Sequence, residues 1–447
     1  MAEPRRSELT VRRERAILVG VILPKSTADP REPLGELASL AKTAGAKVVG
    51  NILQRRQRVD AGTYVGSGKV KEIAALAIKE NADVIIFDND LSPGQIGSLE
   101  QIINKEANSP AMDGIKVLDR SELILDIFAT RAQTHEAKLQ VELAQMQYTY
   151  PRLTRMWGHL ERIAGGAPAG IGTRGPGEQQ LEIDRRLVRK RISRLRDEID
   201  QIQQRKTRLV AERTRENFTI CIVGYTNAGK STLFNTLTGA GTYADDKLFA
   251  TLDTKTRAWN LERGVRVLLS DTVGFVRDLP HNLVASFRAT LEEAVHADLL
   301  LHVLDVGHLH AQQQFDSVHQ VLEEIGVTAK PELLLLNKID TTEGEQNFPE
   351  WRTLHPGAIP LSAKTGRGVD RLLASVLAHV NGQLIEATLE ADTANGRLLA
   401  FIETHCRILG RKFKGRRTVL HVTMSKHVSE DLSRNDQVTV KPIEKKL

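Results

Sequence analysis

The stretch that most limits how this 447-residue chain folds is CIVGYTNAGKST, at residues 221–232. It matches the phosphate-loop pattern, in which Gly224 is followed after four residues by Gly229, Lys230 and Ser231. The apolar run FTICIV before it predicts a strand, and STLFNTLTG after it predicts a helix. In that context Lys230 would bridge the β- and γ-phosphates and the Ser231 hydroxyl would bind Mg²⁺. The stretch predicts a nucleotide-binding domain with a mainly parallel sheet.

Two later segments carry residues suited to a phosphate-bound metal ion. In LLSDTVGF, Asp271 ends a predicted strand and suits a Mg²⁺-bound water, and Gly274 can present its N–H to the γ-phosphate. In KLFATLDTKT, we expect Thr251 to be the second protein ligand of Mg²⁺. Thr254 and Thr256 remain the alternatives to it.

Two motifs further along the chain indicate which base is bound. NKID, at 337–340, follows a strand, and Asp340 can accept hydrogen bonds from N1–H and the 2-amino group of guanine. Adenine offers neither donor, so a carboxylate left unpaired there would penalise it. In LSAKTG, the N–H of Ala363 would meet guanine O6, while Ser362 and Lys364 shape the turn. The two motifs together predict guanine specificity.

The sequence therefore predicts a site for GTP and GDP, with Mg²⁺ held by Ser231, Thr251 and, through water, Asp271. The expected catalytic residues are Lys230, Asn227 and Gly274. The residues expected to line the nucleotide are Gly224, Tyr225, Thr226, Asn227, Ala228, Gly229, Lys230, Ser231, Phe249, Ala250, Thr251, Leu252, Asp253, Asp271, Thr272, Val273, Gly274, Asn337, Lys338, Ile339, Asp340, Ser362, Ala363 and Lys364.

Two residues of the predicted site bear on hydrolysis. Phe275 stands where many GTPases have a glutamine that positions the attacking water, so the intrinsic rate is expected to be low. Asn227 raises the hypothesis of a potassium ion beside the phosphates, because related GTPases with asparagine there can hold one. The alternative is that Asn227 only hydrogen-bonds the switch loop.

A second organising feature is a pair of heptad repeats on either side of a glycine-rich segment. The repeats consist of Leu139, Leu143, Met146, Tyr150, Leu153, Trp157 and Leu160, then Val188, Ile192, Leu195, Ile199, Ile202 and Leu209. They predict an antiparallel helical hairpin over residues 131–213, with Lys206 in one missing position and a kink or break at Pro151. The joining loop, residues 165–177, holds six glycines and exceeds the roughly 2–8 residues that a helix–helix connection needs.

The rest of the chain predicts two further domains around a GTP-binding domain at residues 214–384. Apolar runs alternate with helical spacing over residues 15–130, which indicates a small α/β domain with a parallel sheet. Within it, the stretch VGSGKVKE raises the alternative of a second nucleotide site, although it lacks the full phosphate-loop spacing. The other interpretation is a plain helix that starts at Lys69. Residues 395–447 predict a small α+β domain, so the whole chain is expected to be α/β.

Composition limits the partners and the compartment. The net charge is +6, and Lys and Arg cluster at residues 185–196 and 411–417, which fits a polyphosphate partner or a solvated helix face. Cys221 and Cys406 are too few for a disulfide framework or a zinc site. Since there is no apolar run near 18 residues and no secretory h-region, we expect a cytoplasmic protein without a membrane span. We also expect it to be a monomer.

Beyond these motifs, long segments of the chain resemble the HflX family of GTPases. In chain order the segments are YVGSGKVKEI (64–73), DRSELILDIFATRAQTHEAKLQVELAQ (119–145), GIGTRGPGEQQLEIDRR (170–186), GYTNAGKSTLFN, LFATLD, DTVGF and NKID. The resemblance extends to about residue 385, and P-loop GTPases at large lack the upstream segments. Gln179 departs from the threonine usual in the family but keeps a polar side chain.

The resemblance implies a GTPase that binds the large ribosomal subunit and splits stalled or idle ribosomes under stress. Ribosomal RNA would then be the polyphosphate partner and would stimulate hydrolysis, with the tip of the hairpin inserted into it. The RNA-contacting residues would be Gly170, Gly172, Arg174, Gly175, Arg185 and Arg186. Two alternatives stay open: a GTPase that acts in ribosome assembly or RNA modification, and a binding module with a vestigial nucleotide site.

Overall fold

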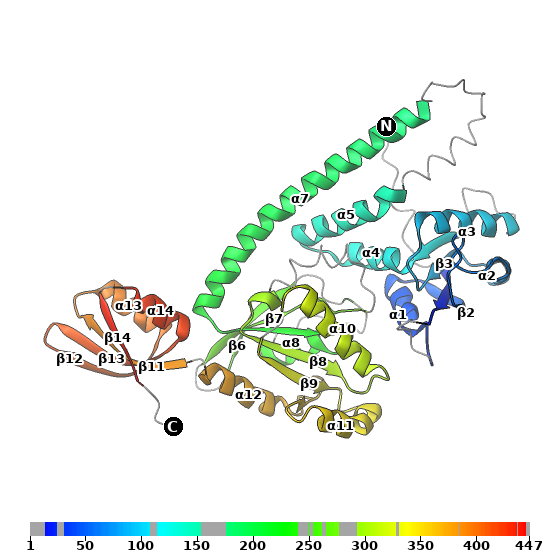
Figure 1. Cartoon of the computed structure of the whole chain (residues 1–447). Helices are drawn as coiled ribbons and strands as arrows, with labels where there is room; N and C mark the ends of the chain where they lie inside the picture. The colour runs from blue at the N-terminus through cyan, green and yellow to red at the C-terminus, as the bar shows by residue number, and fades with distance from the viewer. Residues whose placement is uncertain are drawn as a thin grey trace.

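The computed structural model describes residues 14–24, 31–107, 114–152, 176–239, 249, 254–261, 265–276, 293–327, 330–382, 384–435 and 437–443. In Figure 1 an N-terminal α/β part, a long helix, a central α/β domain and a C-terminal β-sheet part follow one another along the chain. The predicted mixed α/β class is therefore confirmed, including the parallel sheet of the central domain.

The N-terminal part is a parallel sheet in the order β2-β1-β3-β4. Its elements are β1 (Arg15–Ile22), α1 (Gly35–Ala44), β2 (Lys47–Arg55), α2 (Ser67–Lys79), β3 (Val84–Phe87), α3 (Pro93–Glu106) and β4 (Lys116–Asp119). Successive residues of β1 face opposite sides of the sheet, so Leu18 packs with Leu37 of α1 while Val19 packs with Ile73 of α2. The central strands are therefore buried on both faces, as the apolar runs predicted.

The VGSGKVKE stretch forms the beginning of α2. The helix starts at Ser67, two residues before the predicted start at Lys69, and Lys69 pairs with Glu72 one turn later. It ends at Lys79, and Asn81 has the positive φ of 47° that commonly stops a helix. Asn81 therefore lies just beyond the end of α2.

A helical segment joins this part to the central domain. It consists of α4 (Arg120–Arg131), α5 (His135–Thr149), a 3₁₀ turn (Tyr150–Arg152) and α7 (Pro176–Glu216). The two predicted heptad repeats meet where Leu139 and Leu143 of α5 pack against Leu195 and Ile199 of α7. Pro151 lies in the 3₁₀ turn where α5 ends, because proline cannot continue the helical hydrogen bonding. Leu153, Trp157 and Leu160 lie outside the described residues.

Polar pairs fix α5 and α7 in antiparallel order, as expected for a hairpin. Starting at the N-terminal end of α5 and ending at the 3₁₀ turn, the pairs are Glu136 with Lys206, Glu142 with Arg191, and Tyr150 with Arg189. The middle pair is bidentate, with N–O distances of 2.9 and 3.0 Å. Lys206 thus occupies the gap in the apolar repeat because its ammonium has a carboxylate partner 3.4 Å away.

The central domain has its strands in the order β10-β9-β8-β5-β7-β6, with β6 antiparallel to β7 and the others parallel. The elements are β5 (Thr219–Gly224), α8 (Lys230–Thr238), β6 (Lys255–Asn260), β7 (Arg266–Asp271), β8 (Leu299–Asp305), α10 (Ala311–Glu324), β9 (Glu332–Asn337), α11 (Thr342–Leu354), β10 (Ile359–Pro360) and α12 (Val369–Gly382). Since β5, β7 and β9 end in Gly224, Asp271 and Asn337, the predicted site residues gather at one edge of the sheet.

The C-terminal part is an antiparallel sheet in the order β12-β13-β11-β14. Its elements are β11 (Leu384–Asp392), α13 (Gly396–His405), β12 (Arg407–Lys414), β13 (Arg417–Ser425), α14 (Lys426–Ser433) and β14 (Val438–Pro442). β11 is an inner strand of this sheet, so residues 384–392 are part of it and do not form the linker that the predicted boundaries at 384 and 395 left. The basic run 411–417 forms the end of β12 and the turn into β13.

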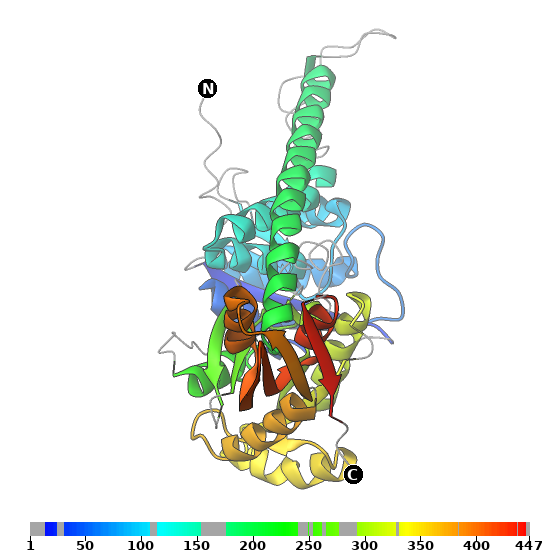
Figure 2. The same cartoon turned by 90° about the vertical axis from the view of Figure 1, so that its left-hand side faces the viewer.

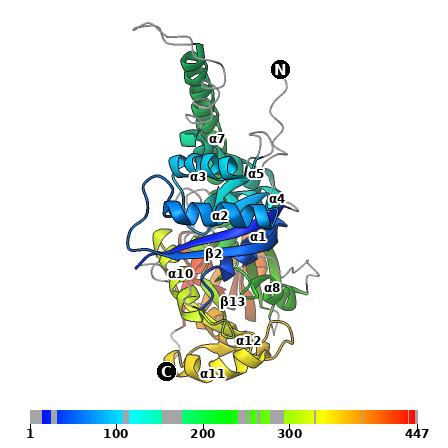
Figure 3. The same cartoon turned by 90° about the vertical axis from the view of Figure 1, so that its right-hand side faces the viewer.

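The parts are arranged around α7. Figure 1 shows the C-terminal sheet at the left, beside the lower end of α7, and the N-terminal part at the right; the C-terminal sheet is in front in Figure 2 and the N-terminal part in front in Figure 3. The central domain lies between and below them, directly after α7 (Figure 1). Among the described helices, none combines the length and the apolar character that crossing a membrane requires.

Candidate nucleotide-binding site

Two glycines give the loop between β5 and α8 its close contacts. Gly224 and Gly229 have φ values of +147° and +99°, which side-chain-bearing residues rarely adopt. A Cβ at Gly224 would lie 2.3 Å from the carbonyl oxygen of Val303, and one at Gly229 would lie 2.2 Å from Nδ2 of Asn337. The backbone therefore approaches its neighbours as closely as the pattern predicted for a phosphate loop.

Lys230 is buried at the first position of α8. Its Nζ donates a hydrogen bond of 2.7 Å to the carbonyl oxygen of Tyr225, so the ammonium lies inside the loop. Burial lowers the pKa of Lys230 to about 8, and the nearby Asp271 opposes that shift. A Cβ at Gly274 would lie only 2.8 Å from this Nζ, so the glycine leaves room for a ligand beside the lysine.

The oxygen donors expected for Mg²⁺ are adjacent. The hydroxyl of Ser231 donates to Oδ2 of Asp271 at 2.9 Å, which joins the start of α8 to the end of β7. A hydroxyl beside a carboxylate is the all-oxygen donor set that Mg²⁺ prefers, so these residues fit the ion. Thr251 lies outside the described residues. Of its alternatives, Thr256 lies in β6 and its hydroxyl is 2.9 Å from the hydroxyl of Ser270, so it serves the sheet.

The base end of the site is organised by Asn337. Its Nδ2 donates to the carbonyl oxygen of Ala228 at 2.7 Å, and its Oδ1 accepts from the N–H of Ala363 at 2.9 Å. One side chain thus ties the phosphate loop to the SAK turn. The N–H of Ala363, expected to meet guanine O6, is used by Asn337 in this structure. Asp340 is exposed. The free-energy cost of an unpaired carboxylate, which would disfavour adenine, would therefore arise only when a bound base shields this carboxylate from water.

The remaining residues of the two base motifs shape their loops. Lys338 has a φ of +65°, and its Nζ lies 2.7 Å from Oδ2 of Asp305 at the end of β8. The hydroxyl of Ser362 accepts a hydrogen bond of 3.1 Å from the N–H of Thr365, which closes the SAK turn as expected. Lys364 is exposed beside it. Ile339 is buried in the domain core and turns away from the surface.

Two side chains predicted to line the nucleotide lie elsewhere, and this corrects the prediction. Phe249 is buried against Phe128 of α4, with ring centroids 4.5 Å apart in an edge-to-face arrangement. Val273 is buried in the same core cluster, together with Val276. These apolar side chains follow hydrophobic burial into the core of the N-terminal part, so Phe249, Val273 and Val276 pack on it. Ala250, Leu252 and Asp253 lie outside the described residues.

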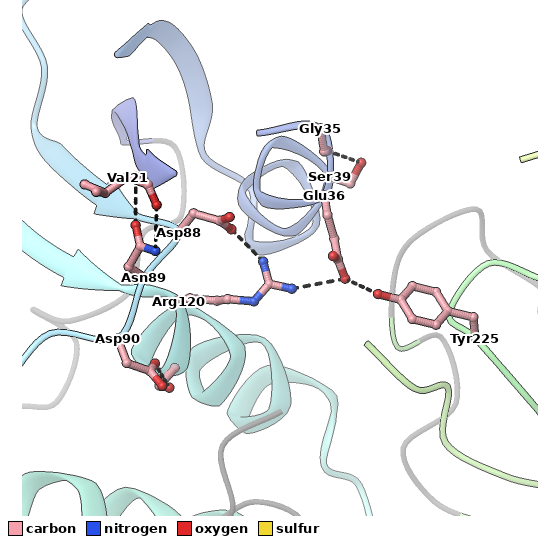
Figure 4. A network of polar contacts seen from close by, with 10 residues as sticks. Val21, Gly35, Glu36, Ser39, Asp88, Asn89, Asp90, Arg120 and Tyr225 are labelled. Carbon is pink, nitrogen blue, oxygen red and sulfur yellow. Dashed lines mark hydrogen bonds and ion pairs between the residues drawn. The ribbon is translucent and has the colours of Figure 1, made fainter. Parts of the chain in front are cut away.

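A polar network also joins the phosphate loop to the N-terminal part (Figure 4). The hydroxyl of Tyr225 donates to Oε1 of Glu36 on α1 at 2.7 Å, so its side chain points away from the phosphates. Glu36 lies 3.1 Å from the guanidinium of Arg120, which also pairs with Asp88 at 2.7 Å. Arg120 is 2% exposed. No local sequence pattern links residues so distant in the chain, so this network could not be predicted from the sequence.

The other predicted residues fall into three groups. Thr226 and Thr272 are buried, and the hydroxyl of Thr272 donates to the carbonyl oxygen of Ile222 at 2.7 Å. Arg185 and Arg186 lie on α7, where Arg186 is exposed and Arg185 partly so. The other predicted RNA contacts, Gly170, Gly172, Arg174 and Gly175, lie outside the described residues.

Models of known protein families match this chain along most of its length. The family models that match are GTP-binding GTPase N-terminal over residues 31–129, GTP-binding GTPase Middle Region over 131–213 and 50S ribosome-binding GTPase over 219–338. Among solved structures, a GTP-binding protein from the archaeon Sulfolobus solfataricus in complex with GDP is 25% identical, over 83% of this chain and 99% of that one. Its TM-score is 0.43, which adds nothing to the assignment.

The fold and the site define a P-loop GTPase. GTPase HflX of Magnetococcus marinus is 44% identical over 87% of both chains, and GTPase HflX of Escherichia coli is 42% identical over 86% of this chain and 87% of its own. The chain therefore belongs to the HflX family of GTPases, and it is a GTP hydrolase. The predicted resemblance is confirmed.

Proposed function

We propose that this GTPase binds the large ribosomal subunit and splits or rescues stalled or idle ribosomes in the cytoplasm, acting as a monomer. The observation that carries the proposal is the continuous contact from the nucleotide loop to the helical hairpin. Tyr225 bonds Glu36 of α1, and Leu37 of the same helix shares a core with Phe128 of α4. Val141 of α5 belongs to that core as well, and α5 packs on α7. A change at the phosphates can thereby reorient the hairpin.

The surface of α7 suits an RNA partner. Apart from Arg189, Arg191 and Lys206, which contact Tyr150 or α5, its described, partly or fully exposed basic side chains are Arg185, Arg186, Lys190, Arg194, Arg196, Arg205 and Arg208. Lysine and arginine in such numbers favour phosphate contacts that depend on salt and not on base sequence. Arg191 and Lys206 are instead paired with α5, which keeps the two helices together. The exposed arginines are thus available to ribosomal RNA while the seam stays intact.

At the nucleotide, each residue is proposed to have one role. Lys230 would neutralise the β- and γ-phosphates, while Ser231, Thr251 and, through water, Asp271 would hold Mg²⁺, which supplies charge stabilisation when bound. Gly274 would offer its N–H to the γ-phosphate, and Asp340 would select guanine. Loss of the γ-phosphate would release Phe249 and Val273 from the core that they share with Phe128 of α4.

The proposal is tested by sedimenting intact ribosomes with the purified protein. With GTP or a non-hydrolysable analogue, the intact-ribosome peak should fall and the subunit peaks should rise, and the protein should travel with the large subunit. GDP should support neither effect, because the switch segments would not be held. Co-sedimentation with small-subunit precursors alone would favour the assembly alternative.

Intrinsic GTP turnover is expected to be slow and to rise at least about tenfold with large subunits. Phe275 is 2% exposed and packs with Ala294 and Ala297, so its side chain cannot position the attacking water. Asn227 is exposed in the loop with a φ of +61°, where it could help to hold potassium. Turnover measured in KCl and in NaCl checks both points. Fast turnover without ribosomes contradicts the first, and equal rates in the two salts contradict the role of potassium.

Glu36→Ala is expected to leave GTP affinity within about threefold of wild type and to slow GTP-dependent splitting about tenfold. The substitution removes the acceptor that joins Tyr225 to Arg120, and a hydrogen bond to a charged group contributes roughly 1.5–3 kcal/mol. Nucleotide affinity and splitting rate are measured on the same preparation. Glu106→Ala, an exposed glutamate at the end of α3, is the control. Equal splitting by both variants would show that the network does not transmit the nucleotide state.

A further inference from the structure

Two histidines and a glutamate meet in the central domain, and none of them belongs to the predicted nucleotide site. His302 lies in β8, His319 in α10, and Glu332 is the first residue of β9. One potential ligand atom from each lies within 4.8 Å of the other two. The number of cysteines gave no reason to expect zinc, but imidazole and carboxylate are zinc ligands as well.

The carboxylate of Glu332 lies between the two imidazole rings. Its Oε1 is 2.8 Å from Nδ1 of His302, and its Oε2 is 3.2 Å from Nε2 of His319. The other ring nitrogen of His319, Nδ1, lies 3.1 Å from the carbonyl oxygen of Phe315. A carbonyl oxygen cannot donate, so Nδ1 carries the proton. In the neutral ring, Nε2 then presents a lone pair to a carboxylate, and a cation or a second proton must separate them.

This is the environment of a metal-binding histidine, which donates its other N–H to a carbonyl or carboxylate and so keeps a fixed tautomer. Zinc–nitrogen bonds of about 2.0–2.1 Å place tetrahedral ligands about 3.3 Å apart. The measured separations of 2.8 and 3.2 Å are close to that value. The distance between the ligating nitrogens of His302 and His319 can adjust by a movement of His319. The side chain of His319 is 37% exposed, while that of His302 is fully buried.

Aromatic side chains form the inner wall of the cluster. The ring of Phe315 is stacked parallel to that of His302, with centroids 5.2 Å apart, and lies 4.3 Å from that of His319. Trp351 packs behind Phe315, at 5.9 Å. Glu332 is partly exposed on the other side. The wall fixes the rings and excludes water from within, while the exposed side leaves a path by which an ion can enter.

We propose that His302, His319 and Glu332 bind one Zn²⁺, with water as a fourth ligand. The ligand atoms are Nδ1 of His302, Nε2 of His319 and the carboxylate of Glu332, whose Oε1 faces His302 and whose Oε2 faces His319. The ion joins α10 to two strands of the central sheet, so it stabilises the folded domain, and this stabilisation grows with the logarithm of the zinc concentration above the Kd. The proposal is independent of the ribosome, since it concerns the isolated protein.

Zinc binding is measured on the full-length protein by calorimetric titration with Zn²⁺, in buffer that contains GDP and excess Mg²⁺. We expect one ion per chain and a rise in Tm. His319→Ala and Glu332→Gln should each weaken binding at least about tenfold and remove the rise in Tm. Co²⁺ should also give the visible absorption of a tetrahedral site in the wild-type protein, a readout that needs no variant.

Two control variants separate this site from others. His355→Ala removes a histidine that contacts the same Phe315 ring, at 5.2 Å, but offers no ligand to the cluster. His310→Ala disrupts a second histidine pair, with His308, that could bind zinc adventitiously. Both should bind Zn²⁺ as the wild type does. A wild-type protein that takes up no stoichiometric zinc, or cluster variants that bind it undiminished, would overturn the proposal.

Discussion

Replacement of residues 165–177 by a four-residue Gly-Ser turn should abolish ribosome splitting while GTP binding and basal turnover stay at wild-type values. Residues 165–175 of the predicted loop lie outside the described residues, while Pro176 and Gly177 are the first residues of α7, which corrects the predicted end of the loop. A plain connection between two helices needs far fewer residues than the predicted loop has. Fixing the loop residues that precede α7 on the RNA would cost roughly 1–2 kcal/mol each, which many RNA contacts at the tip would offset on binding. The nucleotide site is a separate structure, so its chemistry should persist.

A second variant keeps the length of the loop and changes only its chemistry. Thirteen Gly and Ser residues, without Arg174, should restore the reach of the hairpin but neither tight binding nor splitting. Pelleting with large subunits over a range of salt gives the affinity and its salt slope, and density gradients give splitting. If the short variant splits ribosomes at the wild-type rate, the loop is only a connection.

Asp340→Asn should weaken GTP binding at least about 100-fold and improve the binding of xanthosine triphosphate. The carboxylate is proposed to accept two hydrogen bonds from guanine, and each bond to a charged group contributes roughly 1.5–3 kcal/mol. Xanthine carries a carbonyl at position 2, which an amide N–H can meet. Affinities for both nucleotides are measured by competition with a fluorescent GDP. Asp370→Asn, an exposed carboxylate at the start of α12, is the matched control. Unchanged GTP affinity in the Asp340 variant would remove this residue from the site.

Local patterns predicted the elements and the loops that carry the site. The spacing of Gly224 and Gly229 demands a backbone that only glycine adopts readily, so the loop could be recognised without its surroundings. The repeats containing Leu143 and Leu195 predicted the helix pair because a heptad period defines one apolar face. In such cases neighbouring residues in the chain decide the structure.

Contacts between distant parts of the chain could not be predicted. Tyr225 and Glu36 are 189 positions apart, and neither belongs to a pattern that selects the other. Phe249 stands in a segment that resembles a switch loop, yet burial against Phe128 determines where its ring lies. His302 and Glu332 meet only because β8 and β9 are paired. These positions follow from tertiary packing. Contacts between residues far apart in the chain leave no pattern in any short stretch of a single sequence.

The helix α7 is long enough to act as a lever arm. The helix has 41 residues and, at 1.5 Å per residue, is about 60 Å long. Its lower end, Glu216, is followed almost at once by β5, which leads directly to Gly224 of the phosphate loop. A tilt of about 5° at this end would displace the far end by about 5 Å, if the helix stays straight. A small rearrangement around the γ-phosphate would therefore be amplified to a movement of several ångströms at the far end of α7, without any change inside the hairpin.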